Sequence, residues 1–469
     1  MADEFDWKTG VFEGSVAGGY PSYEEVTDTL NLFLYKYPDL IRREPIGKSH
    51  EGRDIFVYKV FSESTPPLMK APNILLLSLL HGAEPVTVLI SLYTIGRLCE
   101  EFRLGVTSSV YLLKTRTLYI IPMANPDAYY AGSVTGKFEF RKNRRPTCPS
   151  DPANSGVDLN RNFPLYWTNM TIPDPCNIEY AGTEPFSEPE TRAIRNVLNR
   201  VEFTSALLLH SFGEMLLFPF NGDASAEIAE VDKPFYDNIK TLFAIDKAGP
   251  VSRILKYNAY GEATDFLYGS MNILAFSLEA GSEANGFLPP INEARNTVIQ
   301  NFDRVKAWIM LSGPRISGIR VTESHNDPGQ LDVAIHNSGQ FVMETSLKLM
   351  SASCVDDAIE ISQVRPGWIE SVPLPVCHSN DLLCTVEMDL ICRCFPSAVG
   401  THELMIDKLS TFSEHRDQCS SLGIPLEVHA PTVSDSAQVF GLGAFAFISI
   451  FLFAVVFLSR TVRAFINGL

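Results

Sequence analysis

Two hydrophobic patterns divide the chain near Pro314. Before it, apolar runs alternate with stretches of helical periodicity, and four runs stand out: Ile74–Leu80, Leu118–Ile121, Ala206–Leu209 and Ile273–Leu278. Apolar runs without polar alternation are typical of strands that are buried on both faces of a sheet. The first 313 residues are therefore predicted to form an α/β domain.

One helix is marked by a signal at its own N-terminus. Ser22 and Glu25 have the spacing of a capping box, and Val26, Leu30 and Phe33 follow at helical spacing. An amphipathic helix is predicted to begin directly after Ser22.

Apolar and polar residues alternate after Pro314. The alternation covers Ile316–Val321, Leu331–His336 and Thr345–Leu349. Strict alternation is typical of strands with one buried face. We expect a small all-β sandwich domain over residues 315–430.

A third pattern lies near the C-terminus. Val439–Leu458 carries no charge, and about 20 helical residues span the core of a bilayer. A buried core helix is the alternative, although such helices rarely lack a polar face over this length. Arg460 and Arg463 follow directly, and basic residues tend to stay on the cytoplasmic side. The pattern predicts a single transmembrane helix, with residues 459–469 as a short cytoplasmic tail.

The N-terminal end leaves the location of the chain open. Met1–Phe5 is acidic and leads into no apolar stretch, so no signal peptide is visible. Either the true start lies upstream and the bulk of the chain is extracellular or lumenal, or the C-terminal helix is the tail anchor of a cytosolic protein.

Cysteine usage favours the oxidising side of a membrane. Six cysteines lie in the last third of the chain: Cys354, Cys377, Cys384, Cys392, Cys394 and Cys419. They could form three disulfides, whereas a zinc knuckle would need paired CxxC spacings that the sequence does not have. Asn169-Met170-Thr171 is an acceptor for N-glycosylation, which is weak evidence by itself. Together these features favour an extracellular or lumenal glycoprotein.

Composition narrows the class of partner. The 469 residues include 38 Lys and Arg against 55 Asp and Glu, which gives a net charge of −17. This balance argues against a nucleic-acid partner, because binding phosphates needs a basic surface. The mean hydropathy of +0.04 is high for an acidic protein. Much of that excess comes from residues 439–458.

Candidate metal ligands lie where two apolar runs end. Ile74–Leu80 leads directly into His81-Gly82-Ala83-Glu84, and His210 closes Ala206–Leu209. A His-x-x-Glu pair alone is a weak signal, and an isolated His210 would more often be a satisfied core histidine. A catalytic zinc ion, however, takes three protein ligands and keeps one position for water. In open α/β sheets, ligands bind at the carboxyl ends of the strands.

Other strand ends carry candidate catalytic groups. Glu279 closes the run Ile273–Leu278, and Asn125 follows another apolar run. A carboxylate at such a place is a plausible general base, and its alternatives are a helix cap or a surface ion pair. Arg141–Arg145 is either a solvated basic loop or, beside a metal, a source of oxyanion stabilisation.

These segments belong to an ordered set of motifs. In chain order they are HGAE, NPDA, RKNRRP, GVDLNRNFP, EPFSEPET, LLLHSFGE and LEAGSEANGFLPP. The set resembles the zinc metallocarboxypeptidases of the carboxypeptidase A type, over roughly residues 20–313. The resemblance implies an α/β fold with a central mixed eight-stranded sheet and helices on both of its faces.

The resemblance implies a metal centre with one zinc ion per chain. His81, Glu84 and His210 match the three zinc ligands of the family. Asp158 matches the carboxylate that orients the first of these histidines through its other ring nitrogen.

The resemblance also implies catalytic and substrate-binding roles. Glu279 matches the glutamate that activates water, and Arg141 matches the arginine that polarises the scissile carbonyl. Asn160 and Arg161 match the pair that binds the free C-terminal carboxylate of the substrate, and Asn125 matches another substrate-binding asparagine. A guanidinium recognises a carboxylate through two parallel hydrogen bonds, so binding that end restricts cleavage to the terminal residue.

Residues around the expected pocket for the C-terminal side chain of the substrate suggest which terminal residue is preferred. Tyr257 matches the tyrosine that closes over the substrate, and Thr264 falls near the base of the pocket. A neutral Thr264 favours neutral or apolar C-terminal residues. Glu262 and Asp223 keep a basic preference open, and Lys256 argues against it.

Other family features concern proteolytic activation of the protein and the cellular compartment in which it folds. Cys148 and Cys176 lie where pancreatic-type relatives have a disulfide. No typical pro-segment precedes the catalytic domain, so no zymogen stage is expected. Ala83 replaces the arginine or asparagine often found inside the first motif, which predicts an altered outer subsite.

The leading hypothesis is a membrane-anchored zinc carboxypeptidase that acts on the C-termini of peptides and proteins. The alternative is a catalytically weak receptor or adhesion module that uses the same groove. That alternative predicts a lost metal ligand or a lost Glu279, and the sequence has neither loss. A zinc endopeptidase is disfavoured because the sequence contains no HExxH motif.

Overall fold

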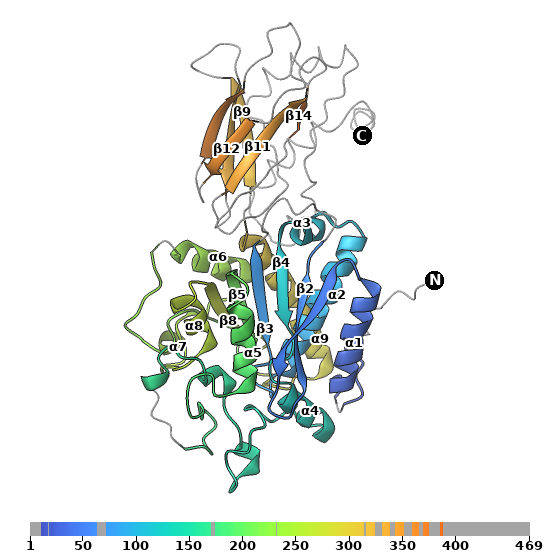
Figure 1. Cartoon of the computed structure of the whole chain (residues 1–469), viewed down its shortest axis with the longest axis vertical. Coiled ribbons are helices and arrows are strands. Elements are labelled where there is room, and N and C mark those ends of the chain that lie inside the picture. The colour runs from blue at the N-terminus through green and yellow to red at the C-terminus, as the bar shows by residue number, and fades with distance from the viewer. Residues whose placement is uncertain are drawn as a thin grey trace. The chain divides into compact units, whose positions relative to one another are not determined.

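The computed structural model describes residues 11–313 except 17, 63–71, 170–173 and 231, together with the backbone of six strands between 316 and 387 (Figure 1). The chain divides into two compact units. The larger unit contains an eight-stranded sheet, and the smaller unit contains the six strands after residue 315.

The larger unit is built on a mixed sheet. Its strands are β1 (Ile41–Lys48), β2 (Asp54–Val60), β3 (Asn73–Ser78), β4 (Thr117–Ile121), β5 (Phe203–His210), β6 (Met215–Leu217), β7 (Ala248–Gly249) and β8 (Leu274–Glu279). They lie in the order β1-β2-β4-β3-β5-β8-β6-β7. The four central strands, β4, β3, β5 and β8, run parallel to one another. The predicted eight-stranded mixed sheet is therefore confirmed.

The four apolar runs of the sequence form these central strands. Every residue of β5 is buried, and so are five of the six residues of β3. Strand β1 has no such run, and the short run Ile55–Tyr58 of β2 lies between the charged residues Asp54 and Lys59. Their pairing is interrupted by a register shift between Pro45 and Gly47, and β1 exposes Arg42 and Arg43, which hides the strand pattern.

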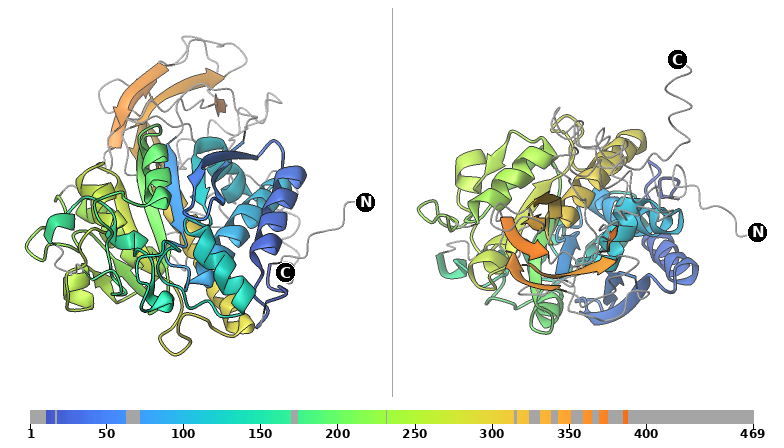
Figure 2. Two further views of the ribbon diagram at one scale, coloured as in Figure 1. Left: turned by 60° about the horizontal axis from the view of Figure 1, so that its bottom comes forward. Right: turned by 90° about the horizontal axis from the view of Figure 1, so that it is seen from above.

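Helices cover both faces of this sheet (Figures 1 and 2). In this unit they are α1 (Tyr23–Lys36), α2 (Pro85–Arg103), α4 (Pro126–Thr135), α5 (Pro189–Leu198), α6 (Lys233–Phe243), α7 (Val251–Ile254), α8 (Ala263–Gly269) and most of α9 (Ile291–Leu311). A further helix, α3 (Thr107–Thr115), is assigned to the smaller unit. Three 3-10 turns, η1 (Pro152–Asn154), η2 (Leu159–Arg161) and η3 (Trp167–Asn169), lie in the long connection between α4 and α5.

Helix α1 begins as the capping box predicts. The Glu25 backbone N–H donates to the Ser22 side chain, and the Glu25 carboxylate accepts from the Ser22 backbone N–H. Val26, Leu30 and Phe33 are all buried on one face of the helix.

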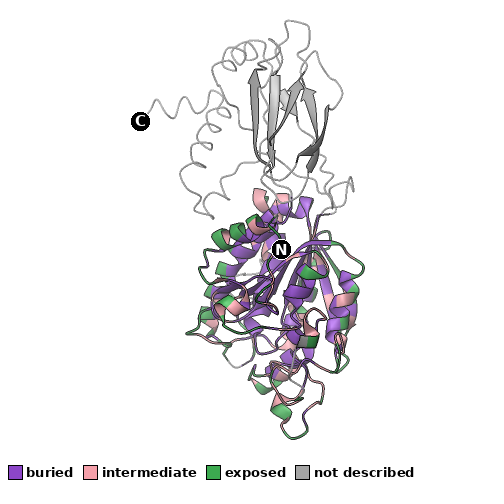
Figure 3. Cartoon of the chain, turned by 90° about the vertical axis from the view of Figure 1, so that its left-hand side faces the viewer, coloured by how far each residue is buried: buried purple, intermediate pink, exposed green. Residues whose placement is uncertain are grey.

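The core of the larger unit lies along the sheet, where the buried residues gather (Figure 3). One cluster joins Leu75, Leu208 and Ala275 of the central strands to Ile194 of α5 and Leu267 of α8. Each large apolar side chain buried in this way contributes about 1.5–3 kcal/mol to folding. The packed central strands are therefore a rigid support for the residues that lie at their ends.

The smaller unit contains two three-stranded sheets with antiparallel pairing. One has the order β13-β10-β9 and the other has the order β12-β11-β14. The strands are β9 (Ile316–Glu323), β10 (Leu331–Asn337), β11 (Met343–Met350), β12 (Ile359–Val364), β13 (Ile369–Leu374) and β14 (Thr385–Glu387). They lie in the stretch where the alternating pattern predicts strands, and a β-sandwich over 315–430 stays a prediction.

Several predictions concern residues outside the described part of the chain. These are the segment 439–458, the tail 459–469, the six cysteines of the last third and most of the sequon that begins at Asn169. Within the described residues, none of the helices has the length and apolar character that a membrane span needs.

Candidate active site

Three adjacent parallel strands bring the candidate ligands and the candidate base to one edge of the sheet. Strand β3 ends at Ser78, and the turn that follows carries His81 and leads into α2 at Glu84. Strand β5 ends at His210 and strand β8 ends at Glu279, and these two residues are register partners. The prediction that the strand ends converge is confirmed for these residues.

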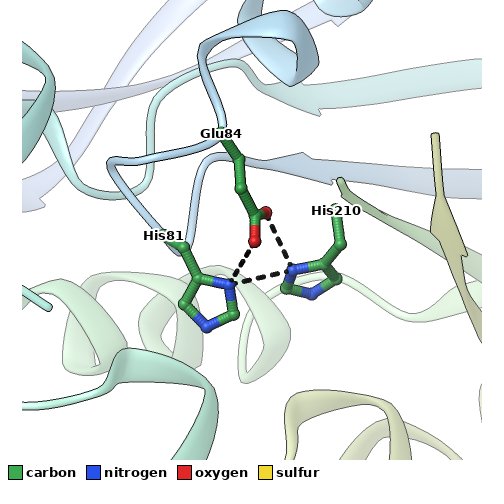
Figure 4. A group of neighbouring side chains, drawn as sticks. All are labelled: His81, Glu84 and His210. Carbon is green, nitrogen blue, oxygen red and sulfur yellow. Dashed lines mark hydrogen bonds and ion pairs between the residues drawn. The ribbon is translucent and has the colours of Figure 1, made fainter. Parts of the chain in front are cut away.

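The side chains of His81, Glu84 and His210 point toward one another (Figure 4). His81 Nδ1 lies 2.8 Å from Glu84 Oε1, and His210 Nδ1 lies 3.2 Å from Glu84 Oε2. The two Nδ1 atoms are 3.2 Å apart, and all three side chains are buried. Ligand atoms that share one tetrahedral zinc ion lie about 3.4 Å apart, because each is about 2.1 Å from the metal. Two imidazoles and a carboxylate in this arrangement fit a zinc ion.

Glu84 is available as a ligand because the helix that it begins does not use its side chain. Glu84 is the N-cap residue of α2, yet its carboxylate makes no capping hydrogen bond. Burial would raise the pKa of this carboxyl, but the charges of His81 and His210 outweigh burial and lower the pKa to about 2. The carboxylate therefore stays anionic and favours a cation at this point.

Asp158 fixes the orientation of His81. Its Oδ1 atom lies 3.1 Å from His81 Nε2, which leaves Nδ1 facing Glu84. Asp158 also accepts from Arg141 Nε at 3.0 Å and from the Asn160 backbone N–H at 2.9 Å. Burial opposes ionisation of Asp158, but Arg141 and His81 hold its pKa well below the ordinary value. A carboxylate behind a metal-ligating histidine fixes both its tautomer and its ring position.

Glu279 has the electrostatic environment of a proton acceptor. Burial and the negative charges of Glu84 and Glu262 raise the pKa of Glu279 to about 7, against the opposing charges of His210 and Arg141. A general base works best when its pKa lies near the working pH.

Arg141 lies beside the metal ligands. Its Nη1 atom is 3.3 Å from His81 Nδ1, and its Nη2 atom is 2.9 Å from Asp158 Oδ2. Burial would lower the pKa of this guanidinium, but the charge of Asp158 raises it above the ordinary value. Arg141 therefore keeps its positive charge next to the centre.

The other basic residues of this cluster hold the loops together. Lys142 is buried and donates to the carbonyl oxygens of Pro175 and Asn177. Arg145 pairs with the buried Glu188 at 2.7 Å. The interpretation of the whole cluster as a solvated basic loop is therefore wrong.

Asn160 and Arg161 belong to the short turn η2, directly after Asp158. Asn160 Oδ1 accepts from the backbone N–H of Ala263, and Asn160 Nδ2 lies 3.4 Å from His210 Nε2. The amide group of Asn160 therefore contacts both the candidate ligand His210 and the start of α8.

Arg161 is buried and has two acidic partners. Its Nη2 atom lies 2.7 Å from Glu179 Oε1, and its Nη1 atom lies 3.3 Å from Glu262 Oε1. Burial would lower the pKa of Arg161, but Asp158, Glu262 and Glu179 raise it. Glu179 is not among the residues that the sequence predicts for the site, because a single acid in an irregular loop carries no pattern.

Asn125 and Tyr257 occupy different environments. Asn125 is buried, caps α4 by accepting from the backbone N–H of Ala128, and donates to the Leu80 carbonyl. Its amide therefore supports the fold beside the site. Tyr257 is 45% exposed, and its pKa is raised by burial against the opposing charge of Arg161.

Thr264 is buried and has a neutral hydrogen-bond partner. Its hydroxyl is 2.7 Å from the hydroxyl of Ser277, and both residues are buried. Asp223 is partly exposed and accepts hydrogen bonds from the backbone N–H and the hydroxyl of Ser225.

Comparison with known proteins places these features in a family. The model of the zinc carboxypeptidase family matches residues 26–304. The chain is 28% identical over 300 residues to Carboxypeptidase B of Astacus astacus, which covers 61% of this chain and 95% of that protein. The crystal structure of Carboxypeptidase A from Helicoverpa armigera has a TM-score of 0.52 and 26% identity, and covers 61% of this chain and 72% of that one.

The relatives include proteins named as carboxypeptidases and a protein named as inactive. The chain is also 28% identical over 243 residues to a protein of Talaromyces stipitatus that is named an inactive metallocarboxypeptidase, covering 49% of this chain and 39% of that protein. The names of these relatives leave open which C-terminal residue this chain prefers.

Proposed function

Because this chain belongs to the zinc carboxypeptidase family of hydrolases, we propose that it is an active exopeptidase that removes single residues from the C-termini of peptides and proteins. The observation that carries this proposal is the convergence of His81, Glu84 and His210 beside Glu279, together with the buried Arg161. An exopeptidase of this kind needs a metal centre, a base and a receptor for the terminal carboxylate.

The metal centre would consist of one zinc ion held by His81, Glu84 and His210. Bound there, zinc supplies a Lewis acid that polarises a carbonyl oxygen and lowers the pKa of water. Asp158 keeps the ring of His81 in the orientation that this role requires.

Glu279 is the proposed general base. Its raised pKa lets it accept a proton from the attacking water near neutral pH and then deliver that proton to the leaving amine. Arg141 is the proposed partner of the scissile carbonyl oxygen. Its charge lies beside the metal ligands and would stabilise negative charge that develops on that oxygen.

Arg161 and Asn160 are the proposed receptor for the terminal carboxylate. A planar guanidinium recognises a carboxylate with two parallel hydrogen bonds, and Asn160 adds a neighbouring amide. The part-exposed Tyr257 lies close enough to interact electrostatically with Arg161, and we propose that it covers the bound terminal residue.

The proposed preference is for a neutral or apolar C-terminal side chain. The hydroxyl groups of Thr264 and Ser277 hydrogen-bond to each other, and neither residue adds a charge to the proposed pocket. Glu262 is engaged by Arg161 and by Asn221 Nδ2, which lies 2.7 Å from Glu262 Oε2. A lysine or arginine side chain would therefore have to break an existing buried ion pair.

The proposed location is the extracellular or lumenal side of a membrane. The apolar segment 439–458 supports a membrane anchor, and the disulfide between Cys148 and Cys176 supports an oxidising compartment. The same acidic charge balance supports a peptide partner and no nucleic acid. The tail-anchored cytosolic form is the alternative location.

The alternative function is a receptor or adhesion module with little catalysis. One relative that is named an inactive metallocarboxypeptidase supports this alternative. The chain nevertheless keeps a chemically competent residue at the positions of His81, Glu84, His210 and Glu279, which favours the enzyme.

A panel of blocked dipeptides that differ only in the C-terminal residue tests the proposal. The zinc-loaded protein should release the terminal residue from neutral and apolar substrates, and C-terminal amides of the same peptides should resist cleavage. Equal rates for free acids and amides would contradict an exopeptidase that binds the terminal carboxylate through Arg161.

A further inference from the structure

The two carboxylates that bind Arg161 differ in their surroundings. Glu262 is buried, and its second oxygen is held by Asn221. The side chain of Glu179 is 36% exposed and reaches Arg161 from an irregular loop. Glu262 is therefore a fixed partner of the guanidinium, whereas Glu179 can turn toward solvent at little desolvation cost.

The loop that carries Glu179 is nevertheless well anchored. Cys176 is joined to Cys148 by a disulfide, and the buried Lys142 donates to the Asn177 carbonyl at 2.7 Å. The side chain of Asn177 then accepts from the backbone N–H of Glu179 at 2.8 Å. The Cα atom of Glu179 is thus placed by several bonds that do not involve Arg161.

The same loop is also tied to the turn that carries the arginine. The Asp158 backbone N–H donates to the Tyr180 carbonyl at 2.8 Å, and the Arg161 N–H donates to the Asp158 carbonyl at 3.0 Å. Glu179 and Arg161 are therefore held opposite each other by the backbone.

The donors of Arg161 leave limited room for a further carboxylate. Nη1 donates to the Asn160 carbonyl and lies next to Glu262, so both of its hydrogens have partners. Nη2 donates to Glu179. A terminal carboxylate that binds the guanidinium through Nη2 shares this nitrogen with Glu179, and the two anions repel each other.

We propose that Glu179 is an affinity-determining residue that occupies the carboxylate receptor until the C-terminal carboxylate of a substrate displaces it. This inference rests on the proposed function, because the displacing group is the end of a peptide. Glu179 makes the receptor selective for ligands that bind Arg161 well enough to replace an internal carboxylate. It therefore weakens the binding of every substrate and leaves the chemical step unchanged.

Calorimetric titration with N-acetyl-L-phenylalanine, a ligand with one free carboxylate, tests the displacement directly. Glu179→Gln should bind this ligand about three- to fivefold more tightly than the unaltered protein, the scale of one part-exposed ion pair. Glu184→Gln is the matched control. Glu184 is exposed and lies on the same connection between α4 and α5, and its replacement by glutamine removes the same charge. Its affinity should equal that of the unaltered protein.

Peptide hydrolysis gives a second measurement. Glu179→Gln should lower KM by the same factor and leave kcat unchanged. A role of Glu179 in positioning Arg161 predicts the opposite sign, a higher KM and weaker binding of N-acetyl-L-phenylalanine. Equal or weaker binding by the variant, or no binding by either protein, would overturn the proposal.

The two proposals fail in different ways. A zinc-loaded protein that hydrolyses no peptide contradicts the proposed function, and the titration still decides whether Glu179 competes for Arg161. An active enzyme whose Glu179→Gln variant binds the ligand no better contradicts the role of Glu179 alone.

Discussion

His210 and Glu279 are register partners at the carboxyl ends of two neighbouring parallel strands. Because β5 and β8 are parallel and stay in register from Ser205 and Leu274 onward, the residues that end them lie side by side at one edge of the sheet. His210 is one of the three buried metal-ligand candidates, so the candidate base is held next to the candidate metal. The relative position of the candidate base and of His210 is therefore set by strand pairing.

Replacing Glu279 by glutamine should remove the base and keep the shape of the side chain. We expect kcat to fall by about 10²- to 10⁴-fold, the usual contribution of general-base catalysis. KM and zinc content should change little. Steady-state kinetics on a blocked dipeptide and metal analysis of the same sample measure both effects.

Glu283→Gln is the control for that variant. Glu283 lies four residues further along, is exposed and pairs with Lys247. This substitution removes the same charge outside the site, so the kinetics of the variant should match those of the unaltered protein. An active Glu279→Gln enzyme would show that another group takes the proton.

Replacing His210 by alanine should abolish stoichiometric zinc binding. The variant leaves two protein ligands, and a catalytic zinc site normally uses three. Elemental analysis after dialysis measures the loss. His50→Ala is the control, because His50 is exposed and is not one of the three candidate ligands. Zinc retained at one ion per chain in His210→Ala would disprove the assignment.

Gly82→Ala should disturb the turn that carries two of the ligands. A Cβ atom at Gly82 would lie 2.3 Å from the Cβ of Ala128 and 2.7 Å from the Phe140 carbonyl oxygen. Backbone on both sides leaves no easy relief, so we expect a loss of about 1–3 kcal/mol of stability. Zinc affinity should fall as well, since His81 and Glu84 flank this position. Urea unfolding and a competitive chelator titration measure the two effects, and a variant with unchanged values would contradict the packing.

A buried carboxylate should make stability depend on pH. Burial and the neighbouring charge of Glu188 raise the pKa of Glu190 to about 7, against hydrogen bonds from the His50 N–H and the Asn143 side chain. Between the ordinary value and about pH 7 the folded protein therefore binds a proton that the unfolded chain has released. The contribution of Glu190 to stability is therefore greatest below this window and falls as the pH rises through it.

Urea unfolding of Glu190→Gln across this pH range tests the assignment. The variant cannot titrate, so its free energy of unfolding should fall less between pH 5 and pH 7.5 than that of the unaltered protein. Glu293→Gln, an exposed site in α9, is the control and should keep the full slope. Parallel curves for Glu190→Gln and the unaltered protein would show that Glu190 is ionised throughout.

Much of the metal site could be predicted from the chain alone, for a physical reason. Apolar runs such as Ala206–Leu209 are long enough to be buried strands, and a polar residue that ends such a run lies at the edge of the sheet. His81, His210 and Glu279 could be found in this way. The disulfide of Cys148 with Cys176, which the family resemblance implies, is confirmed.

Only the tertiary structure decided which charges meet. The partners of Arg161 come from a loop and a helix start 18 and 101 residues away, and no periodic pattern connects them. Lys142 lies in a basic stretch that suggests a solvated loop, yet it is buried, and its ammonium group donates to two carbonyl oxygens of another loop. Asn125 proved to cap a helix. Local sequence determines where strands and caps begin and end, because hydrophobic periodicity and backbone capping act within a few residues. Charge pairing depends on distances that exist only after the chain has folded.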